Sequence, residues 1–457
     1  MPVLSMIKKF AKFFASDTIM FLSAGLLIAS LSTRGVFSIV YHIPAPVGDS
    51  ILFLSTSANY CHSGFLGTPL FPDDPSGAWR FIWHGFWSPL IYGLFNVSCS
   101  VGAFYVINYT VSLCAVVGIL ILSRFYQVSL TLSMAVALYT LALISLFQFR
   151  PEPIAMLLVI VAEATFLNRR YFMVGLAAGF LLFTQPMILL MYGCITVVTK
   201  TVFQKSVLLP LMLGGAAASA ISLAVYPFPA EDLFWGIVKQ AQRLAVRTDG
   251  DIFTYFVLSN FAPLWIAPPL IALTAIGKLC GWKVLFLIFA IYWFGIRVPP
   301  TFYNIAAVSP LLIIMGSSLL RMEAARSAVV TTCILTGAVG IGQLSLKDGM
   351  SVAINGDSIA ATEAALMKDL ADGDMVIRHV PGFYTVLFPD LHFQPDFYPT
   401  LQVGKKGKRV VDHIARSGLG GPCGDTLSEM PMILGHRVFK SPSDWSICRR
   451  VISTPAD

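Results

Sequence analysis

The chain has 457 residues, of which 56% are hydrophobic and 12% are charged, and its mean hydropathy is +0.75. Soluble domains carry about a quarter of charged residues, so this composition excludes an ordinary soluble globular protein. The formal net charge is +7, but the basic residues stand mostly in short loops between apolar runs, which argues against a nucleic-acid partner. We therefore expect an integral membrane protein that contacts membrane lipids.

The first apolar run spans residues 18–41 and is interrupted only by Arg34. It is longer than the apolar core of a secretory signal peptide, which has about 7–15 residues, so we interpret it as an uncleaved first span. Lys8, Lys9 and Lys12 precede it. The positive-inside rule then places the N-terminus in the cytoplasm.

Ten further apolar runs predict an all-α polytopic protein with about eleven transmembrane helices. The runs lie at roughly 101–123, 127–148, 152–168, 171–184, 186–199, 206–226, 258–277, 283–297, 302–320 and 327–345. Pro186 separates the fourth and fifth of them, because proline ends or kinks a helix. If 171–199 were instead one span, every later loop would change sides.

With that separation, basic residues concentrate in the loops on the N-terminal side of the membrane. They are Arg124, Arg169, Arg170, Lys200, Lys205, Lys278, Arg321 and Arg326. The short outer turns hold few basic residues, Arg150 and Arg297 being the exceptions. This asymmetry fits the positive-inside rule and predicts that the C-terminal tail lies outside the cytoplasm, with a bacterial inner membrane as the expected location.

The composition becomes polar after Ser345. We therefore divide the chain into a transmembrane domain, 1–345, and a small soluble α/β domain on the extracytoplasmic (periplasmic) side, 346–457. Within this tail the pattern predicts a helix near 357–371 and strands at Met375–Ile377 and Tyr384–Phe388.

The first outer loop runs from His42 to about Ser100 and is dense in aromatic residues. Such residues suit the membrane–water interface, so we expect short interfacial helices at about 50–62, 77–84 and 88–95. Two cysteine pairs would face an oxidising compartment in this topology, where disulfides can form. They are Cys61 with Cys99 in this loop and Cys423 with Cys448 in the tail.

Three short motifs follow one another in this loop. They are Gly48-Asp49-Ser50, Gly64-Phe65-Leu66-Gly67-Thr68-Pro69 and His84-Gly85-Phe86-Trp87-Ser88-Pro89-Leu90. Their order between the first two spans resembles the GT-C superfamily of membrane glycosyltransferases, and is most similar to the branch with protein O-mannosyltransferases and lipid A aminoarabinose transferases. The resemblance covers 1–200 in pattern and 1–345 in topology. It implies inverting transfer of a hexose or pentose from a polyprenyl-phosphate donor to a lipid, glycan or protein acceptor.

By this resemblance, Asp49 is the essential acidic residue of the first outer loop, and it can deprotonate or orient the acceptor hydroxyl. Ser50 stands where the family commonly has a second acidic residue, which argues against a paired-carboxylate or metal role at this point. A divalent metal is a possible cofactor, but no metal ligands are assigned. Asp49 is also a good N-cap for the helix that follows. Glu152 matches a second catalytic acidic residue of the superfamily, and Arg150 would lie beside it in the donor site. The alternative is that Arg150 and Glu152 form only an interfacial ion pair.

Four further residues are candidates for substrate binding. Arg297 and Tyr303 resemble the basic residue and tyrosine that contact the donor phosphate or sugar, although Arg297 could equally extend to lipid headgroups. His84 and Arg80 could contact acceptor or lipid phosphate, or act as interfacial residues. Glu163 is close enough in sequence to Arg169 and Arg170 to pair with them.

Two other classes of function stay open. A secondary transporter or lipid flippase would show inverted repeats and ionisable residues at mid-membrane, whereas the ionisable residues here cluster at the outer ends of spans. A non-catalytic subunit of an envelope assembly would keep the fold without the activity. No nucleotide-binding glycine-rich motif occurs, which agrees with a lipid-linked donor.

Overall fold

The computed structural model describes most of the helical part of the chain and several strands of its tail. The described residues are 17–41, 49–67, 85–200, 202–227, 229, 231, 267–273, 286–288, 290, 302–320, 323–355, 375–380, 393–395, 409–415, 432–433, 436–437 and 447–452. Most of them are helical, in agreement with the predicted fold class.

Eleven helices have bounds within these residues. They are α2 (Asp17–Ile39), α3 (Asp49–Ser63), α4 (Trp87–Phe95), α5 (Val101–Phe125), α6 (Leu130–Ser145), α7 (Pro151–Leu167), α8 (Tyr171–Leu182), α9 (Pro186–Thr199), α10 (Lys205–Val225), α14 (Phe302–Leu319) and α15 (Glu323–Asn355). Of the predicted interfacial helices, 50–62 corresponds to α3 and 88–95 to α4, whereas 77–84 lies outside the described residues.

Four of these helices are long and apolar enough to cross a membrane: α2, α5, α10 and the segment Ala325–Leu346 of α15. The apolar helices α6, α8 and α9 and the segment Ala307–Leu319 of α14 are shorter than the roughly 20 residues that a span needs. This set is compatible with an integral membrane protein. The count of about eleven spans stays a prediction, because the runs 258–277 and 283–297 fall mostly outside the described residues.

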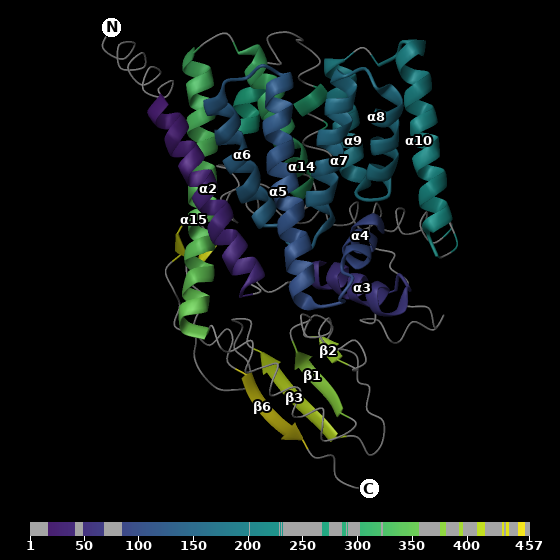
Figure 1. Ribbon diagram of the computed structural model, residues 1–457, viewed down its shortest axis with the longest axis vertical. Coiled ribbons are helices and arrows are strands. Elements are labelled where there is room, and N and C mark those ends of the chain that lie inside the picture. Colours follow the sequence, from purple (N-terminus) through teal and green to yellow (C-terminus); the bar gives the residue numbers. More distant parts are fainter. Residues whose placement is uncertain are drawn as a thin grey trace.

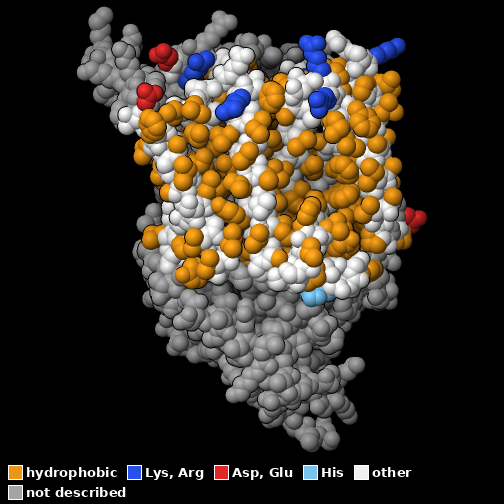
Figure 2. All heavy atoms as spheres, in the orientation of Figure 1, with side chains coloured by type: hydrophobic (Ala, Val, Ile, Leu, Met, Phe, Trp, Pro, Cys, Tyr) orange, Lys and Arg blue, Asp and Glu red, His pale blue; other side chains and the backbone are white. Residues whose placement is uncertain are grey.

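The long helices stand side by side, and from α5 to α10 consecutive helices run in opposite directions (Figure 1). The start of α2 lies at one end of this bundle, and α3 and α4 lie at the other (Figure 1). Exposed basic side chains gather at the end where α2 starts, above a broad apolar band (Figure 2). Those in the described helical part are Arg124, Arg169, Arg170, Lys205 and Arg326. We call this end the basic end and the opposite one the α3–α4 end.

The helix pair α8–α9 confirms the predicted break before Pro186. Helix α8 ends at Leu182, and α9 begins with Pro186 at its first position, where the missing N–H costs no hydrogen bond. Helix α8 also packs closely on α10, because glycines leave room for the backbones to approach. A Cβ atom on Gly175 would lie 1.9 Å from the carbonyl oxygen of Leu211.

Helix α6 forms the centre of the core. It is buried almost all round, as expected of a helix whose faces are all apolar, and it contacts α2, α5 and α15. Helix α15 continues ten residues past Ser345, to Asn355. The predicted division between 1–345 and 346–457 therefore falls inside a helix, and it stays a prediction.

The tail contains a four-stranded sheet with the order β2-β1-β3-β6. Its strands are β1 (Met375–Val380), β2 (Phe393–Pro395), β3 (Arg409–Ala415) and β6 (Ile447–Ile452). Strand β1 is parallel to β2 and β3, whereas β3 pairs antiparallel with β6. A separate hairpin joins β4 (Met432–Ile433) to β5 (His436–Arg437).

The predicted strand Met375–Ile377 is the first half of β1. The predicted strand Tyr384–Phe388 and the predicted helix near 357–371 lie outside the described residues. The assignment of the tail as an α/β domain consequently stays a prediction.

Candidate functional site

The first outer loop forms a helical hairpin at the α3–α4 end. Helices α3 and α4 pack closely at Gly93, where a Cβ atom would lie 2.9 Å from the carbonyl oxygen of Ser57. A disulfide joins Cys61 at the end of α3 to Cys99 before α5, with the two Cα atoms 5.6 Å apart, which is normal for a disulfide. This is one of the two cysteine pairs that the predicted topology allows to form a disulfide; the other includes Cys423, which lies outside the described residues.

The segment Gly85-Phe86-Trp87 docks this hairpin onto the turn between α8 and α9 and onto α10. A Cβ atom on Gly85 would lie 1.7 Å from the carbonyl oxygen of Phe183, so only glycine permits this approach. Phe86 is fully buried, with its ring centroid 5.0 Å from that of Tyr226. Trp87 Nε1 donates a hydrogen bond of 2.8 Å to Ser222 Oγ. The motif around His84 is therefore held against the bundle by its apolar residues.

A buried ion pair lies at the start of α7. Arg150 is the residue before the helix, Pro151 follows at its first position, and Glu152 lies in its first turn, where the helix dipole favours negative charge. Arg150 Nε donates to Glu152 Oε2 at 3.1 Å, and Arg150 Nη2 donates to Glu152 Oε1 at 3.1 Å. Glu152 is only 1% exposed. The pair is thus bidentate and shielded from solvent, a geometry that fixes both groups.

The turn between α8 and α9 joins this ion pair to the first outer loop. Gln185 Nε2 lies 3.5 Å from Glu152 Oε1, at the long limit of a hydrogen bond. The neighbouring residue Thr184 is fully buried and donates to the carbonyl oxygen of Phe180. Gly85 packs on this same turn. The turn between α8 and α9 therefore contacts both the first outer loop and Glu152.

The turn before Arg150 has an unusual backbone. Phe149 has φ = 60°, a left-handed conformation that costs roughly 1–3 kcal/mol in a residue other than glycine. Asn108 of α5 holds it, because Asn108 Oδ1 accepts from Phe149 N at 3.1 Å. The same oxygen accepts from Tyr92 Oη of α4 at 2.8 Å, and burial raises the pKa of Tyr92, which keeps the phenol a donor. Strain of this kind is typical of functional sites.

The remaining predicted site residues have the following positions. Asp49 is the first residue of α3, one position after the N-cap position that the sequence offered for it. Tyr303 lies in the first turn of α14. The side chains of both residues lie outside those that the structure describes. His84, Arg80 and Arg297 lie outside the described residues. No group of three or more His, Cys, Asp or Glu that could hold a metal occurs among the residues that the structure describes.

A second buried cluster lies at the other end of α7, around Glu163, which is 0% exposed. Its carboxylate accepts from Tyr126 and Lys200 and, at 3.2 Å, from Tyr192. The predicted partners were Arg169 and Arg170, but both side chains are exposed in the structure. Lys200 replaces them because α9 ends beside α7 and carries this lysine as its C-cap residue.

A third buried ion pair, Arg34 of α2 with Asp348 of α15, was not predicted. The interruption of the first apolar run by Arg34 was a signal that this side chain needs a partner in the membrane. Asp348 gave no such signal, because it lies beyond the last predicted span. Gln185 was also missed as a site residue, although it directly precedes the helix-breaking Pro186.

No protein-family model matches this chain, and no curated protein matches it either. The candidate site therefore rests on the sequence motifs and on the geometry described above.

Proposed function

We propose that this protein is an inverting membrane glycosyltransferase. It moves a sugar from a polyprenyl-phosphate donor to a lipid, glycan or protein acceptor. The exposed basic side chains mark the cytoplasmic end by the positive-inside rule. The α3–α4 end then faces the extracytoplasmic side of a bacterial inner membrane, and the candidate site with it.

The observation that carries the proposal is the convergence of three segments at the start of α7. They are the buried pair Arg150–Glu152, the turn with Gln185, and the outer-loop segment at Gly85 that packs on this turn. Ionisable groups buried at the end of an apolar helix are costly and are usually retained for function. Here the Arg150–Glu152 pair lies close to the outer loop that carries the motifs resembling those of glycosyltransferases.

The reaction that we propose forms one bond and breaks one bond at the anomeric carbon. The acceptor hydroxyl attacks this carbon and its proton passes to the Asp49 carboxylate. The bond between the anomeric carbon and the phosphate oxygen breaks, and polyprenyl phosphate leaves with the electron pair. Since the phosphate is a good leaving group, the protein needs to stabilise its charge rather than protonate it.

Arg150 and Glu152 have distinct roles in this proposal. Glu152 is occupied by two hydrogen bonds from Arg150 and a long one from Gln185, so it acts by fixing the arginine rather than as a free base. Arg150 then offers positive charge to the departing phosphate. Arg297, Tyr303, His84 and Arg80 complete the proposed substrate contacts.

A transporter or lipid flippase is the second candidate, and one observation favours it. The structure contains ionisable residues buried among apolar helices away from the α3–α4 end, namely Glu163 with Lys200. In transporters such residues bind the coupling ion or the substrate. The transfer assay below separates the two candidates, because only the glycosyltransferase consumes the donor.

The test is sugar transfer in liposomes that contain purified protein and a panel of radiolabelled polyprenyl-phosphate sugars with candidate acceptors. We expect one donor to turn over, and Asp49→Asn to lower the rate about 10²–10⁴-fold through loss of the base. Asp17→Asn is the matched control, because Asp17 also begins a helix but is exposed at the basic end. Full transfer by Asp49→Asn would refute the proposed mechanism, and no turnover of any donor would favour a transporter or a non-catalytic subunit.

A further inference from the structure

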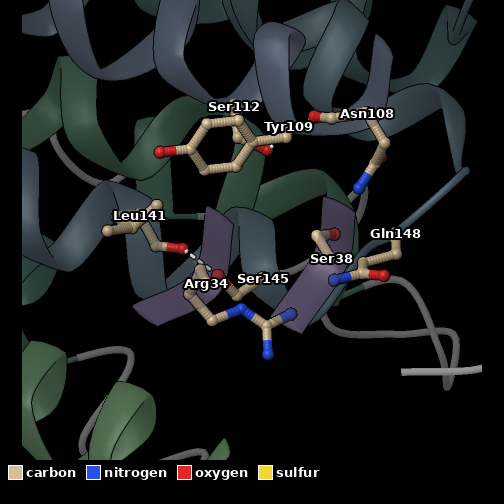
Figure 3. Close-up of a pocket in the computed structure, with 8 residues that line it drawn as sticks. All are labelled: Arg34, Ser38, Asn108, Tyr109, Ser112, Leu141, Ser145 and Gln148. Carbon is tan, nitrogen blue, oxygen red and sulfur yellow. Dashed lines mark hydrogen bonds between the residues drawn. The ribbon is translucent and has the colours of Figure 1, made fainter. Parts of the chain in front are cut away.

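A small polar cavity lies between α2, α5 and α6, close to the turn that leads into α7 (Figure 3). Its volume is about 10 Å³, which is room for about one water molecule. Most of its lining side chains are polar: Arg34, Ser38, Asn108, Ser112, Ser145 and Gln148. A cavity of this size excludes a sugar, a phosphate or a lipid headgroup.

Two of the lining atoms are buried without a hydrogen-bond partner among the described residues. They are a donor, Arg34 Nη2, and an acceptor, Gln148 Oε1. Arg34 is 3% exposed and Gln148 is 9% exposed, so bulk water does not satisfy either atom. An unsatisfied buried polar atom costs roughly 1–3 kcal/mol, and in native proteins an internal water usually meets this need.

We propose that this cavity binds one internal water molecule, which accepts a hydrogen bond from Arg34 Nη2 and donates one to Gln148 Oε1. The second hydrogen of the water has acceptors nearby. Ser112 Oγ and Ser145 Oγ donate to backbone carbonyl oxygens at 2.9 and 2.8 Å, so their own lone pairs are available inside the cavity. The water then makes three hydrogen bonds, the usual number for a buried one.

The charge in the cavity agrees with a neutral ligand. The other terminal nitrogen of Arg34, Nη1, donates to the carboxylate of Asp348, which is 2% exposed. The Asp348 carboxylate compensates the charge of the guanidinium, and the cavity has room for only about one water molecule. Water satisfies Arg34 Nη2 without adding charge.

This water would join two parts of the molecule. The pair Arg34–Asp348 connects α2 to α15, and Gln148 belongs to the turn that ends at Arg150. Through its hydrogen bonds to Arg34 and Gln148, the water would connect α2 and α15 to this turn. Phe149, whose backbone is strained, is the next residue of the turn. The inference concerns hydration alone, so it holds or fails independently of the proposed glycosyl transfer.

The test is X-ray hydroxyl-radical footprinting of the full chain in lipid nanodiscs. Radicals formed from a bound water oxidise the side chains that touch it. Leu141 lines the cavity and is 1% exposed, whereas Leu143 on the same helix is 0% exposed and does not line it. We expect Leu141 to be oxidised faster than Leu143. Equally slow oxidation of the two leucines would mean a dry cavity and would overturn the proposal.

A variant tests whether Gln148 holds the water. Gln148→Leu removes the acceptor at similar volume, so oxidation of Leu141 should fall to the rate of Leu143. Gln204→Leu is the matched control, because Gln204 is exposed before α10, and it should leave the rate of Leu141 unchanged. If Leu141 is oxidised as fast in folded Gln148→Leu as in the wild type, the assigned partner is wrong and the proposal is overturned.

Discussion

The two ends of α7 each carry a buried glutamate paired with a basic residue, but the partners come from different places. At the basic end, Glu163 is satisfied by Tyr126, Tyr192 and Lys200, which belong to or follow two other helices. At the α3–α4 end, Glu152 pairs with Arg150, only two residues away. The first cluster ties helices together, whereas the ion pair of the second joins two residues of the same turn and reaches the α8–α9 turn through Gln185.

Under the proposed function, this difference separates a structural ion pair from one that serves the reaction. A pair that connects distant segments contributes to the stability of the fold, and its removal leaves a buried charge without a partner. A local pair next to a strained turn contributes mainly by fixing a charged group in position, as a substrate site requires. The predictions that follow alter one end at a time.

The largest effect on folding is expected at the basic end. Lys200→Met leaves the Glu163 carboxylate without its cation, and we expect a loss of about 3–5 kcal/mol in the free energy of unfolding. Thermal unfolding in detergent measures it. Lys205→Met is the control, because Lys205 is exposed at the same end. The double variant Glu163→Leu, Lys200→Met should recover part of the loss, and a neutral Lys200→Met would contradict a structural role.

At the α3–α4 end the expected effect is on transfer. Arg150→Gln removes the positive charge proposed to stabilise the departing phosphate, and we expect the transfer rate to fall about 10²–10³-fold. The variant also leaves the buried Glu152 carboxylate without its cation and should melt at a lower temperature, so transfer is compared per folded molecule. Arg124→Gln serves as the control, since Arg124 is exposed at the basic end. Wild-type turnover by Arg150→Gln would exclude this arginine from the site.

A smaller effect is expected where the outer loop meets the bundle. Gly85→Ala forces the loop away from the carbonyl oxygen of Phe183, and such overpacking costs roughly 1–3 kcal/mol. Transfer should also fall, because the loop shifts relative to Glu152. Gly193→Ala has nothing within 4 Å of the added methyl group and should be neutral or slightly stabilising. Equal stability of the two variants would show that the close approach at Gly85 is wrong.

The smallest effect is expected from one hydrogen bond between the loop and α10. Trp87→Phe removes the bond to Ser222 Oγ and should cost about 0.5–1.5 kcal/mol of stability. Ser222→Ala removes the same bond from the other side. The effects of the two substitutions should therefore be less than additive in the double variant, as thermal unfolding can measure. Strict additivity would mean that the two residues do not interact.

Much of the helical pattern could be predicted from the sequence, because its signals are local. Apolar runs marked most of the described long helices, and Pro186 marked the start of α9. The oxidising environment expected of the first outer loop agreed with the disulfide Cys61–Cys99. Each of these inferences needs only residues that are near in the chain or in the same loop.

The partners of the buried charges could not be predicted in this way. Periodicity shows which face of a helix is apolar but does not identify the helix that packs on it. The pairing of Arg34 with Asp348 joins the first and last described long helices, 314 residues apart. The pairing of Glu163 with Lys200 depends on the place of the end of α9 relative to α7, from which it is separated in sequence by α8. The strained backbone at Phe149 likewise depends on Asn108, which lies on another helix.

The most direct test of the account compares two matched substitutions on α7, Glu152→Gln and Glu163→Gln, in one preparation. Transfer per folded molecule and melting temperature are measured for both. The account predicts that folded Glu152→Gln loses most of its transfer, whereas folded Glu163→Gln keeps transfer. Both variants should melt at a lower temperature, because each leaves a buried basic side chain without its carboxylate partner. Equal loss of transfer in both variants, or full transfer by Glu152→Gln, would contradict the assignment of function to the α3–α4 end.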